Sequence, residues 1–345
     1  FCTINNVTCT ISHWKTILPD LLIMRKAKLN SRSDRIIKIL GLVSFTFLMV
    51  IILSPGLFTR ELNSEQAEAI EFMEEMIASI SNHCKNSNLE IDSNIDPNLS
   101  GLIGLEWTEM TSTLGHLDAK RTSIQAEMAA TIVTLLTEAM VQKGDTIGLA
   151  CSGSFPGLML ACLSASKALE INCKMILSLG SSSYGANRMD LTVLDMFAIL
   201  RDKGLVQESL VGVSLGGEQD LGVGWDLPVI LHLIDKIKQS GYPFIREEKL
   251  SMSVEKRAEL IGVRDGSIKL LINSGGAMAN IGTSATILKV KPGLVSKMRM
   301  PDPDQQGLVH KAWEKEIKLI HLLFIKGLAL EYGIRWDRAG SLHAE

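Results

Sequence analysis

The fold is decided by the stretch Thr146 to Arg188, which reads TIGLACSGSFPGLMLACLSASKALEINCKMILSLGSSSYGANR. An apolar run, Thr146 to Ala150, ends in a turn of small residues, and a mostly apolar helix-forming segment follows from Leu158 to Leu169. Pro156 precedes that segment, where the missing N–H of a proline costs nothing. A second apolar run, Met175 to Gly180, ends in a serine-rich turn. This order predicts a βαβ crossover, whose turns lie along one edge of the sheet, and we expect the binding site there.

The chain after this stretch repeats the order of strand, turn and helix. Apolar runs predict strands at 209–215, 242–245, 267–273 and 317–323, and periodic segments predict helices at 191–204, 226–240, 253–263 and 326–332. Ser253 is expected to cap its helix. Glycine-rich turns follow Leu215 and Asn273. Because strands and helices alternate with little to separate them, the sequence predicts one α/β domain, doubly wound around a mostly parallel sheet.

The segment before this βαβ unit is less regular. A helix is expected from Asn63 to Ser81, because an Asn-x-x-Gln capping pattern opens it and apolar residues recur at helical spacing. The segment 102–121 lacks a clear period. A further helix is expected from Thr122 to Val141, with a cap at Thr122 or Ser123.

A long apolar run lies near the amino terminus. Residues Ile36 to Phe58 read IIKILGLVSFTFLMVIILSPGLF and hold one charge, Lys38. A helix of roughly 20 apolar residues crosses the hydrocarbon layer, so the length predicts one membrane-spanning helix. The basic residues before it place the amino terminus in the cytoplasm and everything after Phe58 outside. A cleaved signal peptide and a buried core helix are the alternatives, but no small-residue cleavage pattern follows Leu53.

These features predict three parts in the chain. Residues 1–35 form an amino-terminal extension and a basic cytoplasmic segment, residues 36–58 a transmembrane helix, and residues 59–345 an extracytoplasmic α/β domain. Met24, which basic residues follow, reads as a natural start, so residues 1–23 are expected to contribute little to the fold. The predicted location is therefore the cell membrane, with a single pass.

Composition and cysteine spacing argue against some classes of function. The 345 residues carry a formal net charge of −3, and without a basic excess a nucleic-acid partner is not expected. The cysteines after the apolar run have no CxxC pairs and no metal-ligand spacing with histidine, so no metal site is expected. Outside the cytoplasm they could form disulfides, whose pairing the sequence leaves open. These cysteines are Cys84, Cys151, Cys162 and Cys173.

The turns rich in glycine and serine suit an anion. They present backbone N–H groups and hydroxyls beside helix starts, where a phosphate or a carboxylate is stabilised. The chain has no GxxxxGK[ST] pattern and no GxGxxG followed by an acid about 20 residues on. An exterior location also argues against ATP or NAD, so no cofactor is expected and a carboxylate is the preferred anion.

The predicted ligand-binding set combines these turns with a basic pair. Lys120 and Arg121 would add charged contacts to a carboxylate; their alternative is a solvated helix edge. The full set is Asp118, Lys120, Arg121, Ser152, Gly153, Ser154, Ser182, Asn187, Gly216, Gly217, Asn273, Gly275, Gly276 and Asn280.

The segment ACSGS at the end of the first strand also fits a loose nucleophile elbow, small-x-Ser-x-small. Ser152 or Ser154 would be the nucleophile, and His321 beside the last strand the base, with Asp195 or Asp220 to orient it. The alternatives remain open: a serine hydrolase, a serine-lined binding turn, or simple tight packing, in which His321 would be a satisfied core histidine.

Several stretches together resemble one family. They are GLIGLEWTEMTSTLGHLDAKRTS at 101–123, SGSFPGL at 152–158, SLGSSSYGANRMDLTVLDM at 178–196, VSLGGEQDLG at 213–222, NSGGAMANIG at 273–282 and IHLLFIKGLALEYGI at 320–334. In combination they resemble the poly-γ-glutamate system protein family, membrane-anchored components encoded with the machinery that makes and exports poly-γ-glutamate. The chain departs from the family at Tyr184, where tryptophan is expected, and in its charged carboxyl terminus.

This resemblance implies a single-span accessory protein whose exterior domain binds the γ-linked polymer or a partner of the synthesis and export complex. Poly-γ-glutamate is a string of carboxylates, which suits turns rich in N–H groups and a basic pair. Two other functions remain open. One is a serine hydrolase or transferase that acts on the polymer, and the other is a purely structural assembly subunit.

Overall fold

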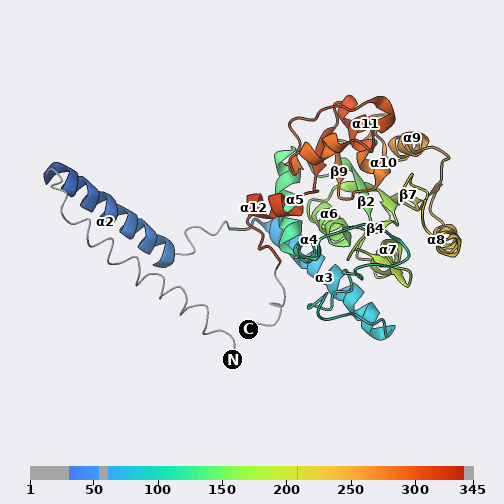
Figure 1. The fold of residues 1–345 in the computed structure, drawn as a ribbon, viewed down its shortest axis with the longest axis horizontal. Helices are drawn as coiled ribbons and strands as arrows, with labels where there is room; N and C mark the ends of the chain where they lie inside the picture. The colour runs from blue at the N-terminus through green and yellow to red at the C-terminus, as the bar shows by residue number, and fades with distance from the viewer. Residues whose placement is uncertain (1–30, 54–60, 208, 338–345) are drawn as a thin grey trace. The chain divides into compact units, whose positions relative to one another are not determined.

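The computed structural model of the protein describes residues 31–53, 61–207 and 209–337 (Figure 1). The chain divides into two units, residues 1–61 and residues 62–345. Most of the predicted amino-terminal extension, residues 1–30, lies outside the described residues.

The first unit contains helix α2 (Ser31–Leu53). This helix covers most of the predicted transmembrane segment, and residues 54–58 of that segment lie outside the described residues. Among the described residues, no helix has both the length and the apolar character that crossing a bilayer requires. Large apolar side chains of α2 between Ile36 and Phe47 are nevertheless 54% to 64% exposed.

The second unit is built on a seven-stranded sheet, in the order β10-β11-β9-β2-β3-β7-β8. Neighbouring strands are parallel except for the antiparallel pair of β10 and β11 at one edge. This arrangement confirms the prediction of a mostly parallel, doubly wound sheet. The strands are β2 (Thr146–Ser152), β3 (Asn172–Ser178), β7 (Leu210–Ser214), β8 (Phe244–Ile245), β9 (Leu270–Asn273), β10 (Gly293–Leu294) and β11 (Lys318–His321).

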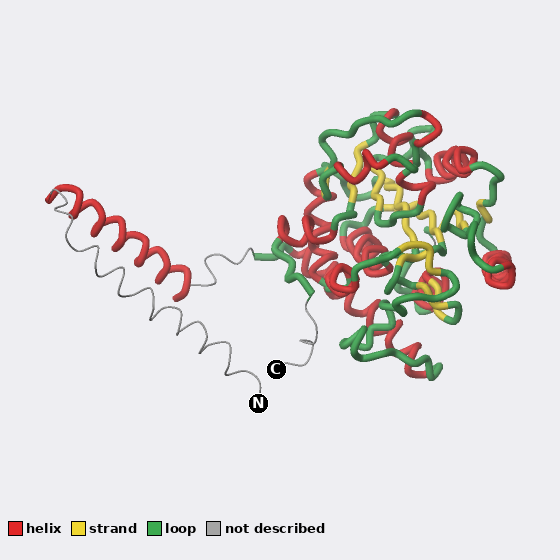
Figure 2. The backbone as a smooth tube through the Cα atoms, viewed as in Figure 1, coloured by secondary structure: helices red, strands yellow, loops and turns green. Residues whose placement is uncertain are grey.

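Helices cover both faces of this sheet (Figure 2). Side chains alternate along each strand, so that Leu149 joins one apolar cluster and Ala150 the other, and Ile272 and Leu271 divide in the same way. The first cluster contains buried residues of α3 (Ser64–Asn86), α5 (Glu127–Glu138), α6 (Pro156–Ala168), α7 (Val193–Asp202) and α8 (Leu227–Ser240). The second contains residues of α9 (Leu250–Ile261) and α11 (Leu308–Glu314).

Two predicted helix starts are confirmed. Asn63 and Gln66 form a capping box at the start of α3, with hydrogen bonds of 2.8 and 3.0 Å. Pro156 is the first residue of α6, as its position in the sequence predicts.

Two other predicted starts are wrong. The helix expected at 122–141 is two helices, α4 (Leu117–Ser123) and α5, and Thr122 lies inside the first, where its hydroxyl donates to the carbonyl of Asp118. Ser253 does not cap α9, which begins at Leu250; its buried hydroxyl donates instead to the carboxylate of Asp220. In both cases a contact in the folded chain uses the hydroxyl that the cap would need.

Small elements complete the edge at the carboxyl ends of the strands. β1 (Thr111–Thr113) pairs in parallel with β4 (Ser181–Ser182), and this pairing ties the segment just before α4 to the serine-rich turn after β3. The remaining elements are β5 (Asn187–Arg188), β6 (Leu191–Thr192), α10 (Met278–Ile281), the 3₁₀ helices η3 (Ala285–Lys289) and η4 (Pro303–Gln305), and α12 (Ile325–Tyr332).

Candidate functional site

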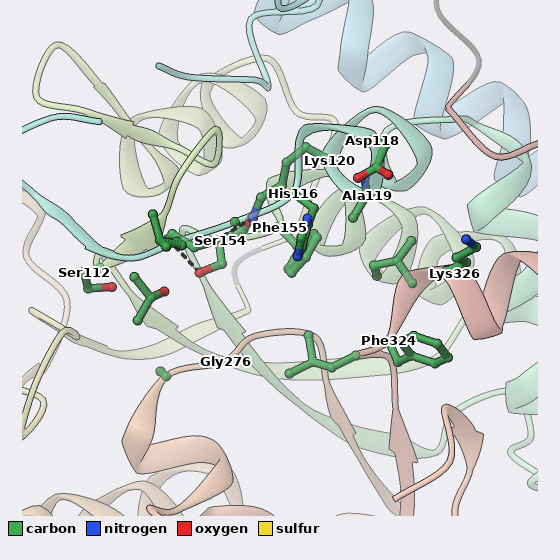
Figure 3. A pocket seen from close by; sticks show the side chains of 18 of the residues that line it. Ser112, His116, Asp118, Ala119, Lys120, Ser154, Phe155, Gly276, Phe324 and Lys326 are labelled. Carbon is green, nitrogen blue, oxygen red and sulfur yellow. Dashed lines mark hydrogen bonds between the residues drawn. The ribbon is translucent and has the colours of Figure 1, made fainter. Parts of the chain in front are cut away.

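A cavity of about 620 Å³ lies at the carboxyl ends of the parallel strands (Figure 3). Its walls come from β1, α4 and the turns after β2, β3, β7, β9 and β11. β3 lies on one side of β2 and β9 on the other, so the winding of the chain reverses here, and open α/β sheets bind ligands at such a switch point. The lining side chains include Leu114, His116, Asp118, Lys120, Ser154, Phe155, Ser182, Glu218, Met278, Leu323, Phe324, Lys326 and Trp336.

Lys120 is the most unusual of these side chains. It is 2% exposed, and its Nζ donates to the carbonyl oxygen of Ser154 and, over 2.8 Å, to Oγ of Ser182. Nζ also lies 3.7 Å from the centre of the Phe155 ring (Figure 3). In the described part of the chain no carboxylate forms an ion pair with it. A buried amine without an acid partner is costly, so its retention points to a use.

Burial lowers the pKa of Lys120 from 10.5 to about 7, because the charged form loses its hydration. The face of the Phe155 ring favours the protonated amine, but by about 1 kcal/mol, which is less than the cost of burial. Near neutral pH both forms of the amine are therefore populated. Lys120 can donate to an anion in one form and accept a proton in the other.

The serines of two neighbouring turns hold each other in place. Oγ of Ser154 accepts from the backbone N–H of Ser182 over 3.0 Å, and Oγ of Ser181 donates to the carbonyl of Gly153 over 3.0 Å. Gly153 leaves room for this contact, since a Cβ there would come within 2.6 Å of the carbonyl oxygen of Leu179. The small residues that marked these turns in the sequence thus allow the turns to interlock.

Some of the predicted ligand-binding residues come together and others do not. The cavity is lined by Asp118, Lys120, Ser154, Ser182, Gly217 and Gly276. The others lie outside it: Arg121, Ser152, Gly153, Asn187, Gly216, Asn273, Gly275 and Asn280.

Arg121 points away from its neighbour Lys120, because consecutive helical residues lie about 100° apart. Its guanidinium donates to the carbonyl oxygens of Asn94 and Ile95 and forms an ion pair of 3.5 Å with Asp337. The two basic residues therefore have different places. Lys120 lines the cavity, and Arg121 joins two loops on the other side of α4.

Two predicted asparagines have structural partners. The Asn187 side chain is buried and bonds to Leu105 and Thr111, which fixes the loop before β1. Asn280 is buried too, and its Oδ1 accepts from the guanidinium of Arg257 over 2.8 Å.

The predicted serine, histidine and acid do not assemble. His321 is 3% exposed, its Nδ1 lies 3.1 Å from Nδ2 of Asn273, and burial lowers its pKa to about 4. Among the described residues, no hydrogen bond joins it to Ser152 or Ser154. Of the candidate acids, Asp195 caps α7 and pairs with Lys236, and Asp220 pairs with an arginine. This arrangement fits the alternative interpretation of His321 as a satisfied core histidine.

A buried arginine, not predicted as a site residue from the sequence, contacts the ends of β3 and β7. Arg257 is fully buried, and it donates to both carboxylate oxygens of Asp220 over 2.8 Å and to the hydroxyls of Ser178 and Ser214. These contacts tie α9 to the ends of β3 and β7. The sequence contains an indication of this role, because Arg257 lies on the otherwise apolar face of its helix, beside Val254.

The structure also places the cysteines and the possible metal ligands. Cys84, Cys151, Cys162 and Cys173 are all free thiols. Within the described ranges, no three histidine, cysteine, aspartate or glutamate side chains gather as metal ligands would.

Comparison with known proteins finds no family model, no curated protein and no solved structure that matches this chain. The resemblance to the poly-γ-glutamate system protein family stays a prediction from the sequence. The chemistry of the cavity is what bears on function.

Proposed function

We propose that this protein is a membrane-anchored accessory component of poly-γ-glutamate synthesis or export, and that its cavity binds a carboxylate-bearing stretch of the polymer. One observation carries this proposal. The Lys120 amine has no acid partner among the described residues and lines a cavity at the switch point of the sheet. A ligand carboxylate would supply the missing partner.

The other walls of the cavity fit a γ-linked glutamate residue, which joins a carboxylate, a short methylene chain and an amide. Phe155, Leu323 and Phe324 offer apolar surface to the methylenes. No described residue accepts a hydrogen bond from the backbone N–H of Gly276 or Ala277, both of which line the cavity. These N–H groups are suited to a carboxylate or an amide carbonyl.

The acidic walls limit how many carboxylates the cavity accepts. Asp118 and Glu218 line it together with Lys120, so a second ligand carboxylate close to them would be repelled. We therefore expect one polymer carboxylate to contact Lys120 while those of neighbouring residues remain in water.

A direct binding measurement tests the proposal. Isothermal titration of the full chain in mild detergent with a γ-linked glutamate tetramer should show binding that Lys120→Met weakens by about tenfold or more, since a charge-assisted hydrogen bond is worth about 1.5–3 kcal/mol. Arg121→Gln is the matched control, because its guanidinium lies outside the cavity. Equal affinity of the wild type and Lys120→Met would defeat the proposal.

A second ligand of equal charge is needed to show that binding depends on the γ-linked backbone and not on charge alone. An α-linked glutamate tetramer carries the same carboxylates on a different backbone, so we expect it to bind more weakly. If both tetramers bind alike and added salt abolishes both, the attraction is electrostatic and general rather than a property of the cavity.

The membrane anchor is proposed from the sequence run Ile36 to Phe58. It is motivated by the exposed apolar side chains of α2 between Ile36 and Phe47, because a continuous exposed apolar surface favours an apolar surrounding. The apolar side chains more than half exposed are Ile36, Ile37, Ile39, Leu40, Leu42, Val43, Phe45 and Phe47. Retention in the membrane pellet after alkaline carbonate, with a carboxyl-terminal reporter active only outside the cytoplasm, is the expected result; release into the supernatant would contradict it.

A further inference from the structure

The contact between Ser182 and Lys120 suggests more than binding. Oγ of Ser182 lies 2.8 Å from Nζ of Lys120, and both side chains line the cavity. A serine hydroxyl within hydrogen-bond distance of a lysine amine is the arrangement that nucleophilic catalysis requires, because the amine can take the hydroxyl proton.

We propose that Ser182 is a nucleophile and Lys120 its general base, so that the cavity is an acyl-transfer site for γ-glutamyl amides. This inference rests on the proposed function for its substrate, since the amides are those of the bound polymer. It moves the chemistry from Ser152 and Ser154, which the nucleophile-elbow pattern singled out, to the neighbouring turn.

Hydrogen bonds and close packing hold Ser182 in one orientation at the cavity wall. Its backbone lies in β4, paired with Thr113, and its N–H donates to Oγ of Ser154 over 3.0 Å. Gly115 faces it, and a Cβ at that position would come within 3.1 Å of Oγ of Ser182. The absence of a side chain therefore lets the backbone at Gly115 pack closely against Ser182.

The amine can reach the neutral form that a base needs. The other titratable groups on the cavity wall are His116 just before α4, Asp118 in its first turn, Glu218 after β7 and Lys326 on α12. Among the described residues, none of these forms an ion pair with Nζ of Lys120. Because burial lowers the pKa of the amine to about 7, the neutral form is populated near neutral pH.

The proposed step balances without any further reactant. Neutral Nζ of Lys120 takes the Ser182 hydroxyl proton while Oγ bonds to the γ-carbonyl carbon. As the carbon–nitrogen bond breaks, the Lys120 ammonium returns that proton to the leaving amine, and an acyl-serine remains. Attack by water then gives hydrolysis, and attack by the amine of another chain gives transfer. The N–H groups of Gly276 and Ala277, for which no described residue is an acceptor, are candidate donors to the carbonyl oxygen during this step.

The neighbouring serines fit this role less well. Ser152 is 1% exposed and lies outside the cavity wall, and its hydroxyl accepts from the backbone N–H of Ser154. Oγ of Ser154 has no hydrogen bond to Lys120, whose Nζ contacts its carbonyl instead. We therefore assign Ser154 as a positioning residue for Ser182.

The test uses a γ-linked glutamate tetramer whose last γ-carboxyl is a 4-nitroanilide, mixed with the full chain in mild detergent. We expect released 4-nitroaniline and an acyl group on Ser182 in the intact-protein mass spectrum. Ser182→Ala and Lys120→Met should each lower the release rate about 100-fold or more. Ser183→Ala is the matched control and should be unchanged, because among the described residues its buried hydroxyl has no partner.

The pH dependence and the binding assay separate the possible outcomes. The wild-type rate should rise with pH through about 7 as Lys120 loses its proton. If Ser182→Ala, shown folded by circular dichroism, binds the unmodified tetramer but the wild type releases no nitroaniline at any pH, the acyl-transfer site is overturned and the binding function stands. Release that depends on Ser182 without binding of the unmodified tetramer would instead overturn the binding function alone.

Discussion

Replacing Lys120 by methionine should make the protein more stable. Burial lowers the pKa of this amine from 10.5 to about 7. The difference between the pKa in the unfolded chain, 10.5, and in the folded chain, about 7, lowers the free energy of unfolding by about 4 kcal/mol at pH 7. Each pKa unit is worth about 1.4 kcal/mol. The variant also loses the ring contact with Phe155 and the two hydrogen bonds of Nζ, which reduces this gain in stability by about 2 kcal/mol. We therefore expect Lys120→Met to gain about 2 kcal/mol, or a rise in Tm of about 6 °C.

The gain should depend on pH in a defined direction. Between pH 7 and pH 10.5 the unfolded chain binds more protons at Lys120 than the folded chain does, so this residue makes wild-type stability rise with pH. Lys120→Met lacks this rise. Its advantage should vanish at about pH 9, where the burial cost has fallen to the about 2 kcal/mol that the lost contacts take back, and should reverse above that pH. Urea unfolding at a series of pH values measures the difference directly.

An exposed lysine supplies the control. Nζ of Lys167 also lies over a phenylalanine ring, 4.1 Å from the centre of Phe72, but its side chain is exposed. Lys167→Met removes a solvated amine and should bring no comparable gain. If Lys120→Met is instead destabilised, by an amount that does not change with pH, then the Lys120 amine is well stabilised in the folded chain and our reasoning about its function loses its basis.

Three further outcomes follow from the same contacts. Affinity for the γ-linked tetramer should fall as pH rises above about 7, because the Lys120 amine loses the charge that attracts a carboxylate, and titration calorimetry across pH 6–9 checks this. Arg257→Met should cost about 3–5 kcal/mol, since it leaves the Asp220 carboxylate buried without its cation, and adding Asp220→Asn should recover part of this loss in urea unfolding. Because burial lowers the pKa of His321 from 6.5 to about 4, stability should fall by about 3 kcal/mol as pH drops from 6.5 to 4, and His321→Asn should lack this share of the acid sensitivity.

The sheet was predictable because its signal is local. Apolar runs that end in small residues predicted the strands β2, β3, β7, β8, β9 and β11, and Pro156 and the Asn63 cap predicted two helix starts. The two-residue edge strand β10 was not predicted, because so short a strand carries no periodic pattern. The helix α4 was missed because it is seven residues long and follows a segment whose pairing partner, β4, lies far away in the sequence.

The site was predictable only in part, for a related reason. The turns after parallel strands meet at one edge by topology, so Ser154, Ser182 and Gly276 could be placed together. Lys120 and Arg121 point in different directions from α4, so the rotation of this helix decides which of them faces the cavity. Packing sets that rotation, and the local sequence does not. The distance between Ser182 and Lys120 is likewise a product of the folded chain.

The most direct test of the account is the protonation of Lys120 itself. NMR of the full chain with ¹³C-labelled lysine, assigned through Lys120→Met, can follow this amine through a pH titration with and without the γ-linked tetramer. We expect a pKa of about 7 for Lys120 in the free protein and a higher pKa when the tetramer is bound. A pKa close to 10.5 that the tetramer leaves unchanged would contradict it.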